Sequence, residues 1–134
     1  VAILLGYESA IGCVDAHLLV GSTTDAEATL DCFAISDSLK EVSLPSTLKT
    51  INRGVFWHCT SLKSIAIPAS VETIGEYVLF DCWNLTDVYN YAPVPQRVPP
   101  IYNKEGITLH VLRGSEELYR KADNWNVAKV VGDL

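Results

Sequence analysis

Apolar and polar positions recur along the chain with a period of 23 residues. Residues 36–59 and 59–82, written one above the other, share eight identical pairs, and six further pairs keep the same chemistry. The identical pairs are Ser38/Ser61, Leu39/Leu62, Lys40/Lys63, Pro45/Pro68, Thr50/Thr73, Ile51/Ile74, Val55/Val78 and Cys59/Cys82. Because the apolar positions stay in register while the polar ones drift, the repeat predicts a solenoid of stacked units.

Each unit predicts a short strand followed by a second extended segment. In the second copy, Leu62, Ile65 and Ile67 alternate with small or polar residues, which is typical of a strand with one buried face. Pro68 has no amide hydrogen to donate and is expected to end the strand. The next residues predict a second extended crossing, where Gly75 supplies backbone freedom, and then a short helical or irregular arc. Since one unit cannot bury its apolar face alone, stacked units must share a core.

The same frame extends in both directions. One series of equivalent inward positions is Leu19, Val42, Ile65 and Val88, and another is Ala28, Ile51 and Ile74. After Val88 the frame breaks. We therefore expect one structural domain, with about four repeats over residues 1–91, degenerate over 1–35, and a proline-rich connector and C-terminal cap over 92–134.

The C-terminal residues predict a strand and a helix that close the stack. Ile107, Leu109 and Val111 alternate as a final strand would. Ser115 is a suitable N-cap, and the two glutamates after it favour the positive end of a helix dipole. The residues expected to face the last coil are Leu118, Ala122 and Trp125.

Composition narrows the possible functions. Hydrophobic residues make up 49% of the chain, which provides ample material for a core, and no apolar run is long enough for a membrane helix. The net charge of −6 repels phosphate backbones, so nucleic acid is not expected as a partner. The chain has no methionine, and its apolar start at Val1–Leu5 has no polar cap. Upstream repeats or another domain are therefore expected.

Cysteine and histidine provide the candidate chemistry. Cys13, Cys59 and Cys82 occupy one repeat position, which favours buried free thiols over a disulfide, whereas Cys32 falls outside that series. No C-x-x-C pair supports a metal site, and no cofactor-binding motif occurs. His58 beside Cys59 suggests a thiol nucleophile, but neighbouring side chains on the coil should point in opposite directions. We expect no catalytic residues and no cofactor, with a thiol hydrolase as the last alternative.

The repeat pattern L-x-x-[IV]-x-[IL]-P-x-[ST]-[LV]-x-x-I-[GN]-x-x-[AV]-F-x-x-C resembles the BspA-like leucine-rich repeat of bacterial surface proteins. Val55 and Val78 stand where the family usually has alanine, and Leu79 where it has phenylalanine. The proline-rich segment 91–100 and the segment 109–125 resemble the family's C-terminal module. Together the period and the resemblance imply an α/β fold: a right-handed leucine-rich-repeat solenoid with a short parallel sheet on its concave side and a C-terminal strand–helix cap.

The outward positions of the predicted sheet form the candidate binding face. They are Glu41, Ser43, Ser64, Ala66, Asp87, Tyr89, Thr108 and His110, and before them in the same frame come the apolar Leu18 and Val20. Solenoids use such faces for binding, and tyrosine and histidine suit contact sites. Ile11, Ala34, Trp57 and Phe80 form a second repeating series, which either packs on the convex side or makes a second contact surface.

These observations favour a non-enzymatic recognition or adhesion module. The resemblance implies a location outside the cell or on its surface, and a partner that is a host or bacterial surface protein or a glycan. A structural spacer within a larger surface protein is the alternative.

Overall fold

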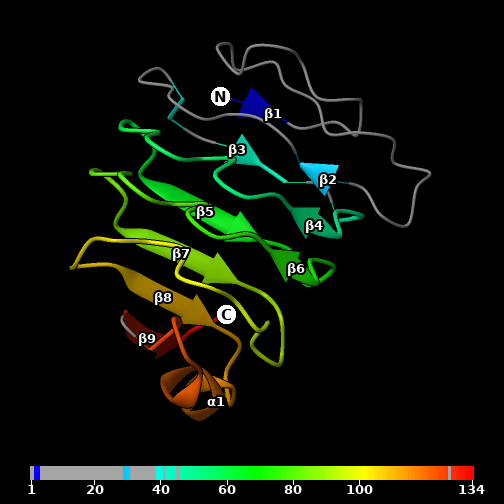
Figure 1. Ribbon diagram of the computed structural model, residues 1–134. Coiled ribbons are helices and arrows are strands. Elements are labelled where there is room, and N and C mark those ends of the chain that lie inside the picture. The colour runs from blue at the N-terminus through cyan, green and yellow to red at the C-terminus, as the bar shows by residue number, and fades with distance from the viewer. Residues whose placement is uncertain (1, 4–28, 31–38, 41, 45, 127) are drawn as a thin grey trace.

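The computed structural model describes residues 2–3, 29–30, 39–40, 42–44, 46–126 and 128–134 (Figure 1). Its elements are β1 (Ala2–Ile3), β2 (Thr29–Leu30), β3 (Val42–Ser43), β4 (Thr50–Ile51), β5 (Ser64–Ile67), β6 (Thr73–Ile74), β7 (Asp87–Asn90), β8 (Thr108–Val111), α1 (Glu116–Lys121) and β9 (Lys129–Gly132). The expectations placed on Glu41, Leu18, Val20, Cys13, Cys32, Ile11 and Ala34 lie outside the described residues.

The strands form a parallel-strand solenoid. Each coil contributes one strand to the column that contains β5, β7, β8 and β9, and the earlier coils contribute a second strand to the column β2–β4–β6 (Figure 1). All ladders are parallel, and Ile65 pairs with Val88 as Ile51 pairs with Ile74. The 23-residue period is therefore the distance along the chain from one strand to its neighbour, as predicted.

The N-terminal register differs from the predicted one. Leu30, not Ala28, lies level with Ile51, because the connection from β2 to β4 is two residues shorter than the connection from β4 to β6. The neighbour of β3 is β1, with Ala2 paired to Val42, so the inward position assigned to Leu19 is not the one beside Val42. A frame of constant length was wrong here because a connection can change length while the strands stay paired.

At the C-terminal end the stack continues beyond the predicted break at Val88. Leu109 pairs with Val88, and Val130 pairs with Leu109, each step now spanning 21 residues. The strand β8 is therefore followed by β9, which the sequence did not predict. A fixed 23-residue frame missed these coils because each is two residues shorter.

Turns, and not helices, connect the two columns. Residues 53–58 and 76–81 are turns, and α1 is the only helix found in the described ranges, so the predicted α/β class holds only for that one short helix. Two positions of the turn have left-handed backbone in both coils. At the first, Gly54 (φ 66°) corresponds to Tyr77 (φ 63°), and at the second, His58 (58°) corresponds to Asp81 (59°).

The interior is one hydrophobic cluster that runs from Leu39 to Val130. The predicted series Leu39, Leu62 and Leu85 is exposed by no more than 2% at any member. In β5, β7 and β8 buried residues alternate with outward ones, as the pattern predicted.

A buried polar pair attaches the proline-rich connector to the strand column. Asn90 points inward where β5 and β8 have Ile67 and Val111, and its amide nitrogen donates to Gln96 Oε1 at 2.8 Å. Gln96 Nε2 donates in turn to the carbonyl oxygen of Val71 at 3.0 Å. Because each amide finds a partner, the pair can be buried without an uncompensated loss of hydration.

Gly75 is required for a different reason from the predicted backbone freedom. Its φ is not positive, but a Cβ atom here would collide with the backbone of Arg53 and lie only 2.9 Å from the carbonyl carbon of Asn52. Gly75 N also donates to Ile51 O at 2.8 Å. The glycine therefore permits close approach of two coils.

Two details of α1 differ from the prediction. Ser115 Oγ makes no capping bond to the helix and donates to Pro93 O at 2.9 Å. Leu118 is 49% exposed, whereas Tyr119 and Trp125 are fully buried. The helix ends at Lys121, so it is too short for the full-length face that the spacing suggested, and Tyr119 takes the inward position.

Candidate functional site

The outward face of the sheet β5–β7–β8–β9 brings together most of the predicted site residues. One row across the strands is Ser64, Asp87, Thr108 and Lys129, and the next is Ala66, Tyr89, His110 and Val131. Ser43 is exposed on β3. The parallel register places these side chains next to one another, although they come from coils 21 or 23 residues apart.

His110 lies between two carboxylates. Its Nε2 is 2.7 Å from Asp87 Oδ1 on β7, and its Nδ1 is 2.8 Å from Asp133 Oδ2 beyond β9. Both ring nitrogens can donate only in the imidazolium form, so this geometry favours the charged histidine. The cluster joins three successive coils on the outer face of the sheet.

The pKa values in this cluster follow from those contacts. Burial of the imidazole acts to lower the pKa of His110, but hydrogen bonds and charge from Asp87 and Asp133 outweigh it and the pKa is raised. The hydrogen bond from His110, assisted by one from Thr86, lowers the pKa of Asp87. The ring of Tyr89 stacks on that of His110 with centroids 4.4 Å apart and planes 15° apart. The aromatic pair is thus held by the charged cluster.

Small side chains beside the stacked pair leave the face hollowed. Around Ala66, a depression of about 370 Å³ is bordered by Tyr89 and Tyr91, and Tyr91 is 42% exposed. A second depression of about 320 Å³ continues past Ala66 towards Pro68. Tyrosine rings around a small floor residue offer apolar contact area together with hydroxyl groups.

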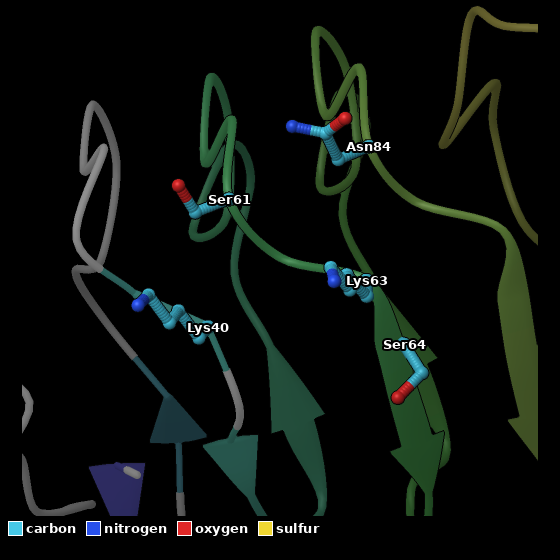
Figure 2. A pocket seen from close by; sticks show the side chains of 5 residues that line it. All are labelled: Lys40, Ser61, Lys63, Ser64 and Asn84. Atoms are coloured by element: carbon cyan, nitrogen blue, oxygen red, sulfur yellow. The ribbon is translucent and has the colours of Figure 1, made fainter.

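A basic depression of about 460 Å³ lies where the chain enters the strands. It is lined by Lys40, Ser61, Lys63, Ser64 and Asn84. Figure 2 shows Lys40 and Lys63 on neighbouring coils, leading into β3 and β5, with Ser61 and Asn84 on the turns before them. The two lysines are equivalent in the repeat, so the stack places two positive charges close to the hollowed face.

Sequence reasoning missed several members of this surface. Asp133 and Val131 were missed because β9 was not predicted, although the pair Val130-Val131 is an apolar signal in a polar context. Lys40 and Lys63 were identified as a conserved pair of the repeat but not as surface residues. Tyr91 was assigned to the connector.

The described cysteines are poorly suited to nucleophilic chemistry. Cys59 and Cys82 are free and fully buried, as favoured from the sequence. Burial raises the pKa of the Cys82 thiol to about 11, and its Sγ donates to Phe56 O at 3.1 Å. His58 points to the surface, as expected from the alternation, with its side chain 47% exposed. A thiolate, the reactive form, is thus disfavoured at Cys82.

Two searches of the described residues gave no candidate. No group of three or more His, Cys, Asp or Glu side chains there could hold a metal ion. Within the same ranges, no helix has the length and apolar character that crossing a bilayer requires.

The chain matches the family described as BspA type Leucine rich repeat region (6 copies) over residues 27–96. That match covers more than half of the chain. The chain belongs to the BspA-type leucine-rich-repeat family. Comparison with curated proteins gave no match, and neither did comparison with solved structures. Membership of this family indicates a repeat module for interaction, and its match ends where the proline-rich connector begins.

Proposed function

We propose that this BspA-type repeat module is a non-enzymatic recognition unit that binds a protein partner on the outer face of β5–β7–β8–β9. The observation that carries the proposal is the hollow around Ala66, bordered by Tyr89 and Tyr91. Interface hot spots favour tyrosine in central, well-packed positions, and parallel solenoids present extended faces of this kind. Ser43, Ser64, Thr108 and His110 form the polar surroundings, and Glu41 belongs to the same predicted face.

The proposal includes a concave curvature of this face, a right-handed coil, and closure of the stack by α1 and β9. It also includes a single domain made of the repeats and the C-terminal segment. A stack that ends without a covered apolar face would be insoluble, which supports a closing role for the last strand and helix.

The charge distribution favours a protein over a glycan at this face. Two lysines stand at one end, whereas Asp87 and Asp133 carry acidic charge at the other. A partner with the complementary arrangement of charges would be oriented along the face, since complementary potentials fix the register of a complex. A glycan on the same face is the alternative outcome of the experiment below.

We further propose that the module acts outside the cell or on its surface, held by upstream repeats or another domain. Family membership supports this placement, because BspA-type repeats are typical of surface and secreted proteins. The alternative function, a spacer that only extends another domain, requires no binding at this face. The complete gene product separates the two, since a spacer needs a distal domain.

The binding test uses the full chain in surface plasmon resonance against immobilised extracellular-matrix proteins and bacterial surface proteins. The variant Ala66→Arg fills the hollow, and Tyr91→Ala removes one wall. Each is expected to weaken binding about tenfold or more. Leu118→Ala, on α1, is the matched control, because Leu118 is 49% exposed and is not part of the face.

Absence of binding across the panel, with a folded protein, would contradict the recognition role and favour the spacer. Binding that the Ala66 and Tyr91 variants leave unchanged would instead place the contact elsewhere. Binding to glycans alone would replace the protein partner.

A further inference from the structure

Opposite columns of the coil present different surfaces, and the turns after β4 and β6 carry aromatic side chains that the proposed function does not use. Three backbone hydrogen bonds of 2.8–3.1 Å join residues 53–58 to residues 76–81. The donors and acceptors are Gly54 N to Glu76 O, Phe56 N to Val78 O and His58 N to Phe80 O. The two turns are therefore held in register against each other.

The side chains of these turns divide between core and surface. Phe56 and Leu79 are buried, with at most 1% exposure, whereas their neighbours Trp57 and Phe80 lie outward. Together with Arg53, Gly54 and Tyr77, these outward residues line a depression of about 590 Å³, named here the aromatic pocket. Trp57 is 41% exposed and Tyr77 37%, so large apolar ring area faces solvent.

Neighbouring groups hold each ring in place. Trp57 Nε1 donates to Asp81 Oδ2 at 3.2 Å. The guanidinium of Arg53 stands 5.1 Å from the centroid of the Tyr77 ring, and Phe80 meets that ring edge-on at 4.8 Å. The rings therefore lose little freedom when a ligand arrives, which favours affinity.

The backbone beneath Tyr77 is strained in a way that the fold alone does not require. The equivalent residue of the previous coil is Gly54, which adopts the same left-handed φ without a Cβ penalty. A tyrosine at φ 63° is unfavourable, and such strain is concentrated at ligand sites. The second coil thus has a costly aromatic residue where the first has a glycine.

Charged groups around the aromatic pocket are already paired. Arg53 Nε lies 3.1 Å from Glu76 Oε1, and Asp81 Oδ1 accepts from Asn103 Nδ2 at 2.8 Å. A charged ligand would have to break these pairs, whereas a neutral ligand with many hydroxyl groups can add hydrogen bonds to them. The turn amides of Gly54, Phe56 and His58 are used between coils, so they cannot pair with an added peptide strand.

We propose that the aromatic pocket is a second binding site, which takes a neutral sugar ring of an oligosaccharide. The negative face of an aromatic ring attracts the slightly positive C–H face of a pyranose, and the rim carboxylates and guanidinium accept and donate to its hydroxyl edge. Trp57 provides the main platform and Tyr77 the second wall. This site is separate from the protein-binding face on β5–β7–β8–β9.

Isothermal titration calorimetry of the full chain with cellohexaose, chitohexaose and mannohexaose tests the proposal. At least one of these neutral saccharides is expected to bind at about 1 mM or below. Trp57→Ala is expected to weaken that binding about tenfold, with partial recovery in Trp57→Phe. Tyr77→Gly should weaken it as well, and its fold is safe because glycine accepts the left-handed backbone.

Two controls separate the aromatic pocket from other surfaces. Trp83→Ala removes a tryptophan that is 53% exposed and does not line the pocket, and Tyr91→Ala alters the sheet face. Both are expected to change saccharide binding by less than about twofold. Failure of all three saccharides to bind, or equal binding by the folded Trp57 and Tyr77 variants, would overturn the proposal. Neither result bears on the protein-binding face.

Discussion

At the scale of single residues, the close approach of two coils limits side-chain size at Gly75. Replacement by alanine places a Cβ against the backbone of Arg53, which cannot move aside as a flexible side chain could. We expect Gly75→Ala to lower the free energy of unfolding by about 2–3 kcal/mol, measured by urea denaturation. Gly106→Ala is the comparison, because a Cβ there meets open space and pays only for φ 81°, about 1 kcal/mol.

The Asp87–His110–Asp133 cluster predicts how stability changes with pH. The folded-state pKa of His110 is raised above its ordinary 6.5, so folding favours the proton. This contribution is complete below about pH 6.5 and is lost as the pH rises through the raised pKa. The pKa of Asp87 is lowered from 3.8, so its contribution is present above that value and lost as the pH falls through the lowered pKa. Stability from the cluster is therefore greatest between these two limits.

Urea unfolding at intervals from about pH 5 to pH 9 measures this dependence. The His110→Asn variant should show a weaker decline above neutral pH than the original chain. Asp133→Asn removes one of the two carboxylates and should give an intermediate decline. Equal declines in all three proteins would mean that the cluster does not control the titration.

At the scale of elements, α1 is held by aromatic side chains that reach the connector. Tyr119 Oη donates to Ala92 O at 2.8 Å, and Trp125 Nε1 donates to Gln96 O at 2.8 Å. Tyr102 Oη donates to Trp125 O at 3.2 Å. A helix of six residues is too short to be stable alone, so these contacts and the core determine its position.

Neighbouring residues of α1 should therefore respond very differently to truncation. Tyr119→Ala removes a fully buried ring and its hydrogen bond, and we expect a loss of about 3–5 kcal/mol in the free energy of unfolding. Leu118→Ala, beside it, should change stability by less than about 0.5 kcal/mol. Chemical denaturation of both variants gives the comparison. A large loss at Leu118 would restore the helix face expected from the sequence spacing.

The repeating strands could be predicted because their signal is periodic and apolar. Ile65, Val88 and Leu109 occupy inward positions in β5, β7 and β8 as the alternation indicated. Changes of coil length could not be predicted in the same way, since a two-residue difference in a connection leaves no periodic trace. For this reason Ala28 was matched to Ile51, and β9 was not recognised.

The candidate face was predictable by position but not by contact. The pattern placed Asp87, Tyr89 and His110 on one face, yet nothing in the spacing linked His110 to Asp133. Asp133 follows a strand that only the three-dimensional stack identifies. The aromatic pocket was anticipated through Trp57 and Phe80, whereas the left-handed Tyr77 shows no sequence signal.

At the scale of the whole molecule, the continuous cluster from Leu39 to Val130 predicts cooperative unfolding. Nearest-neighbour coils share buried residues, so loss of one interface exposes the next. In a variant with serine at positions 13 and 32, urea transitions followed by Trp125 emission and by alkylation of Cys59 and Cys82 should coincide. Their probes stand at opposite ends of the cluster, so separate midpoints would show that the two ends unfold independently.

The last strand, β9, has β8 as its paired neighbour, and its outer edge faces α1. Arg120 Nη2 donates to Val130 O at 3.2 Å, and the side chain of Glu116 fills the space beside Gly132. An open edge of a sheet invites a foreign strand to add itself and begin aggregation. A second molecule arriving at this edge would first have to displace a charged guanidinium, so these two helix side chains keep the module from polymerising end to end.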